Sequence, residues 1–299
     1  MYILNKTYYN HALQKIKQAN EELSKVQEAI SSGKQINRPS DNPEGTQMVL
    51  QYRSILATVQ QYSENVEFAH DWCQATDHVL ESTYNLLLRC REIGYSQASG
   101  TNSEEIRAVA AQEVSGIYDD LLALANTEHD GRYLFAPERI DLPPFDPGTV
   151  LDEIPPAGPP EFLMHVKIGD EKEIQINTSK DAFTGGGEGK NIFRVVNQLK
   201  TSIENDDQEA IQAVIEELDQ ALKQISRHQA MAGCKLRDLD RYQELLTKLK
   251  YTTETSLSQK EDADITEKLM DLIQKENNYS ISLSTLSKIL HINLLDLIG

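Results

Sequence analysis

The sequence contains few of the residues that build catalytic and metal-binding sites. Its 299 residues include three cysteines, one tryptophan and six phenylalanines. Cys73, Cys90 and Cys234 show no Cys-x-x-Cys or metal-ligand spacing, and an odd number of cysteines gives no disulfide framework. All three fall within helical patterns, so we expect small, buried apolar side chains. The motifs His-Glu-x-x-His and Gly-x-Ser-x-Gly are both missing. We therefore predict a protein that is not an enzyme, with no catalytic residue, no cofactor and no metal.

Long apolar runs and an excess of basic residues are also missing. The sequence has no stretch of about 18 apolar residues, which predicts that no segment spans a membrane. Residues 1–10 are polar and lack the apolar core of a cleavable signal peptide. The net charge of −18 argues against nucleic acid as a partner, because a phosphate backbone requires a basic surface.

The net negative charge of the protein comes from the middle of the chain. Residues 1–50 carry six Lys or Arg against five Asp or Glu, and residues 265–299 carry three Lys against four Asp or Glu. These ends therefore have net charges of +1 and −1, and the whole of the −18 lies in residues 51–264. Nearly neutral ends suit segments that pack against other copies or neighbours, although ordinary surface charge explains most of the individual residues.

Both ends of the chain have the heptad pattern of coiled-coil helices. In residues 5–32 the first seam position holds Tyr9, Ile16, Leu23 and Ile30, and the second holds Ala12, Ala19 and Val26. In residues 265–299 the seam residues alternate in steps of four and three, with Glu276 as the one polar member: Ile265, Leu269, Leu272, Glu276, Tyr279, Leu283, Leu286 and Leu290. Neither helix has enough apolar area to be stable alone. We expect the N-terminal arm, residues 1–40, to pair with the C-terminal arm, residues 265–299.

The body of the protein is predicted in residues 41–136 and 190–264. An apolar stripe in steps of four and three runs from Met48 to Cys90 and predicts a helix over 45–92. Further helices are expected from residue 104, over 192–203 and over 208–256. The expected helix-capping and helix-ending residues are Thr101 with Glu104, Gly131, Asp206 with Asp207, and Asp264 with Glu267. The two longest helices can lie antiparallel, which predicts a mainly α fold: a long antiparallel coiled-coil helical rod with a small β-rich insertion.

The insertion is predicted in residues 137–189. Eight of the ten prolines lie between Pro137 and Pro160, which excludes both a helix and a central strand there. Residues 162–168 and 173–176 alternate weakly between apolar and polar side chains around Gly169-Asp170, which predicts a β-hairpin. Because helical seams continue on either side, we expect an outward-facing decoration that the helical body does not need in order to fold.

A glycine-rich stretch, Thr184 to Lys190, has the composition of a phosphate-binding loop. It lacks two residues of that motif, because Thr184 stands where the first Gly is required and Asn191 where Ser or Thr follows the Lys. A flexible connector is the favoured interpretation. A nucleotide-binding coiled-coil protein of the cytosol stays as an alternative that requires residues 185–190 to bind phosphate.

The most specific stretch separates the first two helices, in residues 31–45. Gly33 is expected to end the first helix, and Pro39 and Pro43 prevent a continuous one by disfavouring the helical region for Arg38 and Asn42. Asn42 is a good N-cap for the second helix, with Pro43 in its first position. The sequence therefore predicts a fixed elbow between two helices.

Three strings resemble the flagellin and hook-associated protein superfamily of bacteria. Residues 36–43 match the segment that follows the first helix in that family, and the residues that carry the match are Asn37, Arg38, Pro39, Ser40, Asp41, Asn42 and Pro43. Residues 124–136 match a second family string around Asp-Gly-Arg-Tyr-Leu-Phe, and residues 258–265 match a third that ends in Glu-Asp-Ala-Asp-Ile. The Arg-Pro-Ser-Asp form is closer to the hook–filament junction members than to filament flagellins. The resemblance fades between residues 137 and 189.

The resemblance implies a structural role in the bacterial flagellum. Junction members form an annulus of identical subunits between hook-associated protein 1, on the hook side, and flagellin. They leave the cell unfolded through the flagellar export apparatus, without a cleaved signal, so an extracellular location at the hook–filament junction is expected. A filament flagellin is the main alternative. The expected assembly interface consists of Tyr9, Ile16, Leu23, Val26, Ile30, Leu269, Leu272, Leu283, Leu286 and Leu290.

Overall fold

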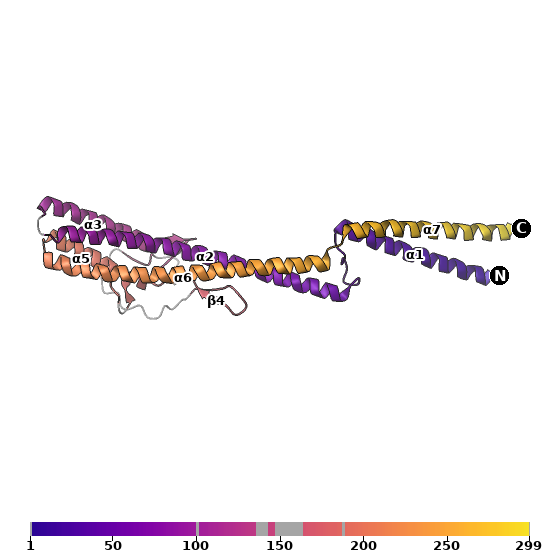
Figure 1. Ribbon diagram of the computed structural model, residues 1–299, viewed down its shortest axis with the longest axis horizontal. Helices are drawn as coiled ribbons and strands as arrows, with labels where there is room; N and C mark the ends of the chain where they lie inside the picture. Colours follow the sequence, from indigo (N-terminus) through magenta and orange to yellow (C-terminus); the bar gives the residue numbers. More distant parts are fainter. Residues whose placement is uncertain (1, 100–101, 136–142, 147–163, 187–188, 299) are drawn as a thin grey trace. The chain divides into compact units, whose positions relative to one another are not determined.

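The computed structural model describes residues 2–99, 102–135, 143–146, 164–186 and 189–298, and the side chains of residues 9–288 within these ranges. Seven helices and four short strands occur in this part of the chain (Figure 1). The helices are α1 (Tyr2–Ser32), α2 (Pro43–Gln97), α3 (Glu104–Ala125), α4 (Asp181–Thr184), α5 (Ile192–Glu204), α6 (Gln208–Glu261) and α7 (Ile265–Ile298). The strands are β1 (Glu128–His129), β2 (Arg132–Tyr133), β3 (His165–Lys167) and β4 (Glu173–Gln175). The prediction of a mainly α fold built on long helices is confirmed.

The chain divides into two compact units. The terminal unit consists of residues 1–59 and 248–299, and the central unit of residues 60–247. Helices α2 and α6 contribute to both units, because the division falls inside them. The predicted division into arms and body at residues 40 and 265 stays a prediction.

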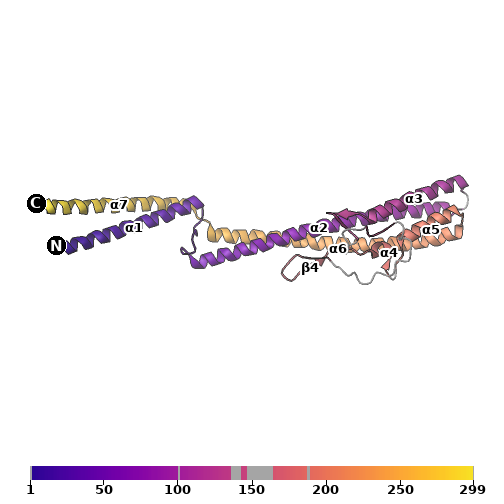
Figure 2. The ribbon, with the colours of Figure 1, turned by 180° about the vertical axis from the view of Figure 1, so that it is seen from behind.

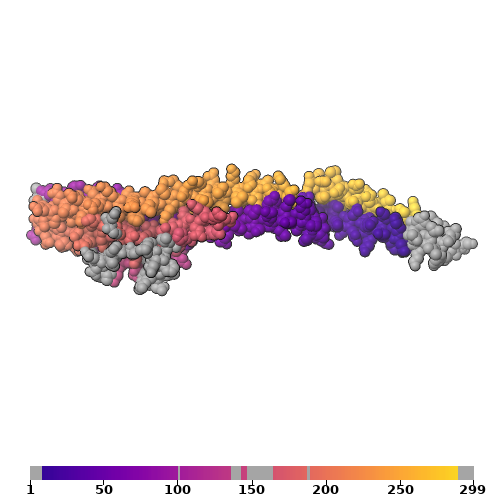
Figure 3. Space-filling model, turned by 90° about the horizontal axis from the view of Figure 1, so that it is seen from below, coloured from indigo at the N-terminus to yellow at the C-terminus, as the bar shows by residue number. Residues whose placement is uncertain are grey.

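In the terminal unit, α1 and α7 pack along each other, as Figures 1 and 2 show from opposite sides. The two helices are antiparallel, because the Ala263 amide donates to the Gly33 carbonyl where α1 ends and α7 is about to begin. Farther along the pair, Lys275 Nζ lies 2.6 Å from a carboxylate oxygen of Glu22, which fixes the same register. Figure 3 shows the indigo surface of α1 lying against the yellow surface of α7.

The central unit has a helical core made by α2, α3, α5 and α6. Tyr62, the first residue of the predicted α2 stripe in this unit, is half-buried, and the stripe residues that follow it are all buried: Val66, Ala69, Cys73, Thr76, Leu80, Thr83, Leu87 and Cys90. The hydroxyls of Thr76 and Thr83 donate to the carbonyls four residues earlier, so these polar seam residues are satisfied. Ion pairs join α2 to its neighbours, between Arg91 and Asp219 at 2.9 Å and between Arg89 and Glu113 at 2.7 Å.

Asp130 and Gly131 form the turn of a tight hairpin between β1 and β2. His129 pairs with Arg132, and both turn residues have positive φ, 50° and 72°. This is the combination that a two-residue type I′ turn requires. The expectation that Gly131 closes the preceding helix was therefore wrong: α3 ends at Ala125, with Asn126 as its C-cap. The α3 N-cap is Ser103, whose Oγ accepts from the Ile106 amide, and Thr101 lies outside the described residues.

The predicted hairpin in the insertion is confirmed, but its packing differs from the expectation. Strands β3 and β4 pair antiparallel, with Val166 opposite Ile174. The described residues from 137 to 189 place five apolar side chains in the core of the central unit rather than on its outside: Phe145, Ile168, Ile176, Ala182 and Phe183, each 1% exposed or less. The described parts of this segment therefore contribute to the core of the unit, which contradicts the expectation of an outward-facing decoration.

Two of the three cysteines are buried and one is exposed. Cys73 and Cys90 are buried, as predicted, and burial raises the pKa of their thiols to about 11 and about 12. Cys234 is exposed on α6, so the prediction that it is buried was wrong. The helical pattern around Cys234 did not reveal that its face of α6 is open to solvent.

Candidate functional site: the terminal helix pair and its elbow

The predicted assembly residues lie on the two helices of the terminal unit, where the α1–α7 contact only half-covers them. Those on α1 are all half-buried: Tyr9, Ile16, Leu23, Val26 and Ile30. On α7, Leu272 and Leu286 are half-buried, whereas Leu269 and Leu283 remain 45% and 44% exposed. The side chain of Leu290 lies outside the described residues. Among the described side chains of α1, residues 9–32, only Ala29 is buried.

A second apolar stripe runs along α7, away from the predicted seam. It consists of Met270, Ile273 and Ile281, which are 63%, 61% and 63% exposed. Their spacing places them on one helix face, about 135° from the centre of the seam at 100° per residue. Exposed apolar side chains on two faces of one helix are typical of a surface that is covered by a partner.

The elbow signature forms a compact turn between α1 and α2. The Asp41 amide donates to the Arg38 carbonyl at 3.0 Å, which closes a turn with Pro39 in its second position, where proline is favoured. The Asp41 carboxylate accepts from the Arg38 amide at 3.1 Å. Asn37 Nδ2 donates to the Lys34 carbonyl, and the Arg38 guanidinium pairs with Glu28, both at 3.0 Å. Pro39, Ser40 and Asp41 are exposed, so this turn is held by its own hydrogen bonds rather than by burial.

The predicted cap of α2 is confirmed. Asn42 Oδ1 accepts from the Gly45 amide at 2.9 Å, and Pro43 is the first residue of the helix. A Cβ at Gly45 would lie 2.6 Å from Ile36 Cδ1 and 2.7 Å from Asn42 Nδ2, so a larger residue there would displace both side chains, including the capping one. The predicted end of α1 is confirmed as well, since Gly33 follows Ser32 with a φ of 70°.

Replacing Asn42 with alanine should weaken the first turn of α2 by about 1 kcal/mol, the usual effect of a lost cap. Hydrogen exchange at the Gly45 amide, which would lose its acceptor, measures this effect directly. Ser40→Ala serves as the control, because Ser40 is exposed in the same turn. Unchanged exchange at Gly45 in the Asn42→Ala protein would show that the cap does not stabilise the elbow.

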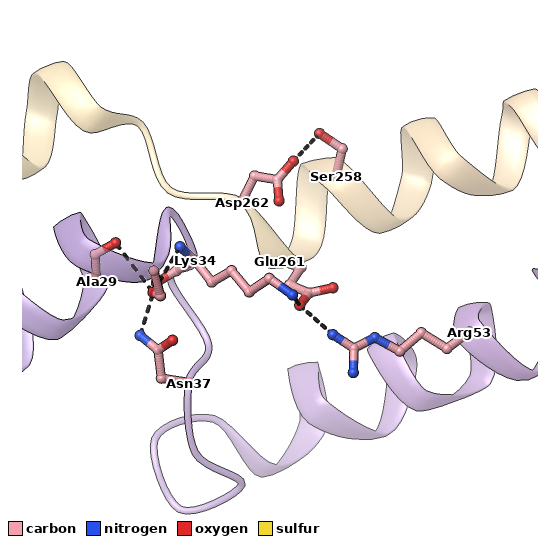
Figure 4. A network of polar contacts seen from close by, with 8 residues as sticks. Ala29, Lys34, Asn37, Arg53, Ser258, Glu261 and Asp262 are labelled. Carbon is pink, nitrogen blue, oxygen red and sulfur yellow. Dashed lines mark hydrogen bonds and ion pairs between the residues drawn. The ribbon is translucent and has the colours of Figure 1, made fainter.

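The residues that tie the elbow to the other end of the chain were missed by the sequence analysis. Figure 4 shows the Glu261 carboxylate between Lys34, which follows α1, and Arg53 of α2. Glu261 lies inside the third family-like string, which was interpreted only as the start of the last helix. That interpretation is confirmed for Asp264, whose Oδ1 accepts from the amides of Thr266 and Glu267 at 2.9 and 3.2 Å. A pair of residues 208 or more positions apart in the chain gives no local signal.

The glycine-rich loop is organised around a glutamine of α6 and not around a ligand. Gln224 accepts from the Lys190 amide at 2.9 Å and donates to the Ala182 carbonyl at 3.0 Å. The Gly185 amide donates to the Asp181 carbonyl of α4, the Gly189 amide donates to the Gly185 carbonyl, and Lys190 Nζ pairs with Glu217 at 2.7 Å. These two amides, the Lys190 amide and this ammonium group are donors that a phosphate could use, and all four are already engaged.

An open pocket of about 520 Å³ is lined by residues of α2 and by His129 of β1. Acidic and histidine side chains contribute to its lining: Asp71, Asp77, His78, Glu81 and His129. Among the described residues no group of three His, Cys, Asp or Glu is arranged to hold a metal ion. His129 packs edge-on against Trp72, with ring centroids 5.8 Å apart.

No helix in the described part of the chain is long and apolar enough to cross a membrane.

Comparison with known proteins places these features in a family. A model described as the bacterial flagellin N-terminal helical region matches residues 3–139. Flagellar hook-associated protein 3 of Salmonella typhimurium is 30% identical over 150 residues, which are 50% of this chain and 47% of that protein. The match thus spans about half the length of this curated relative. A flagellin of Listeria monocytogenes is 21% identical over 278 residues, which cover 91% of this chain and 90% of that protein.

A solved structure supports the same assignment at the level of the fold. The flagellar junction protein FlgL from Legionella pneumophila superposes with a TM-score of 0.57 at 12% identity, and the alignment covers 72% of this chain and 99% of that one. The elbow string, the string around the Asp130-Gly131 turn and the helical fold thus agree with the family model. Residues 3–139 of the chain thus match the N-terminal helical region of bacterial flagellin, and the chain is similar to flagellar hook-associated protein 3 over 50% of its length.

Proposed function

We propose that this protein is a structural subunit of the bacterial flagellum that forms the junction between the hook and the filament. In this proposal, copies of the chain form an annulus that sits on hook-associated protein 1 and presents its other side to flagellin. The subunit is exported through the flagellar export apparatus and acts outside the cell. Its role is mechanical and no reaction is involved. The observation that carries the proposal is the half-covered helix pair at the two chain ends, in a chain that is similar to hook-associated protein 3.

The terminal helix pair supplies the mechanism of assembly. In the isolated chain, Leu269 and Leu283 of the seam are nearly half exposed, and Met270, Ile273 and Ile281 of the stripe are more than half exposed. Burial of one such side chain against a neighbouring subunit stabilises the assembly by about 1.5–3 kcal/mol. Several of them acting together favour association with neighbouring subunits. The ring then joins a flexible, curved tube to a stiffer one.

A filament flagellin is the second candidate, and one observation favours it. The similarity to Listeria flagellin extends over 91% of this chain, whereas the match to hook-associated protein 3 covers 50% of it. The elbow string Arg38-Pro39-Ser40 and the string over residues 131–135 favour the junction protein. The nucleotide-binding alternative has little support, because the donors of residues 185, 189 and 190 are engaged within the protein.

Antibody labelling of isolated flagella tests the proposal. A gold-labelled antibody against the central unit should mark a single band where the hook meets the filament. The antibody should be raised against residues 60–247 of this protein and absorbed against flagellin collected from the medium of a strain that lacks it, so that cross-reaction with flagellin is removed. Labelling along the whole filament would identify a flagellin instead, and labelling confined to the cell body would contradict both flagellar functions.

A further inference from the structure

Two backbone connections join the α1–α7 pair to α2 and α6 within the terminal unit: residues 33–42 and residues 262–264. These connections are hydrogen-bonded to each other. The Gln35 amide donates to the Glu261 carbonyl at 2.8 Å, and the Ala263 amide donates to the Gly33 carbonyl at 2.9 Å. Lys34 and Asp262 form the antiparallel bridge between these two bonds. One connection therefore cannot change its course without breaking hydrogen bonds of the other.

The side chain of Glu261 lies at the centre of this crossing. It is only 6% exposed, and its Oε1 accepts from Arg53 Nη2 at 2.5 Å and pairs with Lys34 Nζ (Figure 4). Lys34 belongs to the first connection, Arg53 to α2, and Glu261 is the last residue of α6. A carboxylate this deeply buried requires opposite charges beside it, because an unpaired buried charge is strongly destabilising. One carboxylate thus joins three segments that are distant in sequence.

We propose that Glu261 is a charge lock that holds both connections in a single conformation, so that the α1–α7 pair and the adjoining ends of α2 and α6 move as one piece. In this role Glu261 is a positioning residue, and it acts in the free subunit as well as in an assembly. The charge lock would fix the angle at the elbow, and the importance of this angle for the flagellum rests on the proposed junction function. The existence of the charge lock does not depend on that function.

The other ion pairs of the elbow do not have the burial that this role requires. The Arg38 side chain is 66% exposed and its partner Glu28 is 38% exposed. Lys25 is 70% exposed and lies 3.9 Å from Asp41. Exposed pairs of this kind are screened by salt and contribute little. They also join α1 only to the 33–42 connection and do not reach the 262–264 connection, so removal of either pair leaves the two connections joined.

Amide hydrogen exchange of the full-length monomer in the Glu261→Gln variant tests the lock. This change preserves the shape of the side chain and removes its charge. We expect the Gln35 and Ala263 amides, one on each connection, to exchange faster by the same factor of about 10 to 100, as loss of a charge-assisted hydrogen bond implies. Amides of α2 in the core of the central unit, from residue 66 to residue 90, should keep their protection. Arg38→Gln is the matched control and should leave both reporter amides unchanged.

A mutant cycle separates a lock from general destabilisation. Arg53→Gln should also accelerate exchange at both amides, but it should have little further effect in the Glu261→Gln background, because its partner charge is already gone. Additive effects of the two changes would overturn the proposal, as would acceleration at only one of the two amides or at neither. None of these outcomes depends on flagellar assembly, so the lock can fail while the junction function stands, and the reverse also holds.

Discussion

Replacing Phe183 with alanine should lower the free energy of unfolding of the central unit by about 3–5 kcal/mol, the range for a buried phenylalanine. Phe183 is completely buried and contacts three other phenylalanine rings, those of Phe135, Phe145 and Phe193, at centroid distances of 4.9, 5.5 and 5.9 Å. The substitution removes all three ring contacts and leaves a cavity in a cluster to which α5 and two segments outside the long helices contribute. Chemical denaturation followed by circular dichroism measures the loss.

The matched control is Phe68→Ala, the same substitution at a phenylalanine that is 36% exposed and has one ring contact, with Trp72 at 6.3 Å. It should cost about 1 kcal/mol or less. Equal effects of the two substitutions would contradict the conclusion that residues 137–189 belong to the core. So would a cooperative melt that survives when residues 137–189 are replaced by a short Gly/Ser linker.

The role of this segment could not be predicted from the sequence. The weak alternation around Gly169-Asp170 correctly predicted the β3–β4 hairpin. The exclusion of helices by the prolines of residues 137–160 stays a prediction, because most of that stretch lies outside the described residues. Neither signal says against what the hairpin packs. Ile168 and Ile176 are buried, and Asn65 Nδ2 of α2 donates to the Lys167 carbonyl at 2.6 Å, a contact between residues 102 positions apart. A lone phenylalanine such as Phe183, beside a glycine-rich loop, has no periodicity that could reveal its neighbours.

The long helices were predictable because their apolar residues recur at steps of four and three, the spacing of one helix face. The alternation of four and three residues on α2 identified every buried seam position from Val66 to Cys90. The end of α1 was predictable because Gly33 adopts the positive φ that ends a helix. The starts of α2 and α7 were predictable because the side chains of Asn42 and Asp264 accept hydrogen bonds from the first backbone amides of these helices. Local rules failed at Gly131, because Asp-Gly is suited both to the end of a helix and to a hairpin turn.

The candidate site shows the same division between local and distant information. The heptad pattern named the seam residues of both arms but not the stripe of Met270, Ile273 and Ile281 on α7, and the elbow string named the turn between α1 and α2. Glu261 was missed because its partners, Lys34 and Arg53, are 227 and 208 positions away in the chain. Only the fold brings a residue at the end of α6 to the connection that follows α1.

The proposed function depends on the apolar seam of the α1–α7 pair, so two charged residues on the α7 side of this terminal seam should abolish assembly. Leu283→Asp with Leu286→Asp places carboxylates on the face of α7 that we expect neighbouring subunits to cover, where unpaired charges cannot be buried. Leu283 is already 44% exposed and Leu286 half-buried, so the melting of the central unit should hardly change.

In cells, the double variant Leu283→Asp/Leu286→Asp should be exported but should not be retained on hooks, so that flagellin is shed into the medium and the cells do not swim. Immunoblots of the medium measure export, and electron microscopy of hooks measures incorporation. The matched control is Asn278→Asp with Thr285→Asp, which adds the same charge to exposed polar positions of α7 that lie away from both the apolar seam and the stripe of Met270, Ile273 and Ile281. The control protein should assemble nearly normally. Normal capping of hooks by the exported Leu283→Asp/Leu286→Asp protein would show that the terminal seam is not the assembly interface. Equal loss of assembly in both variants would point to added charge on α7 as the cause, because the control keeps every apolar residue through which the proposed interface acts.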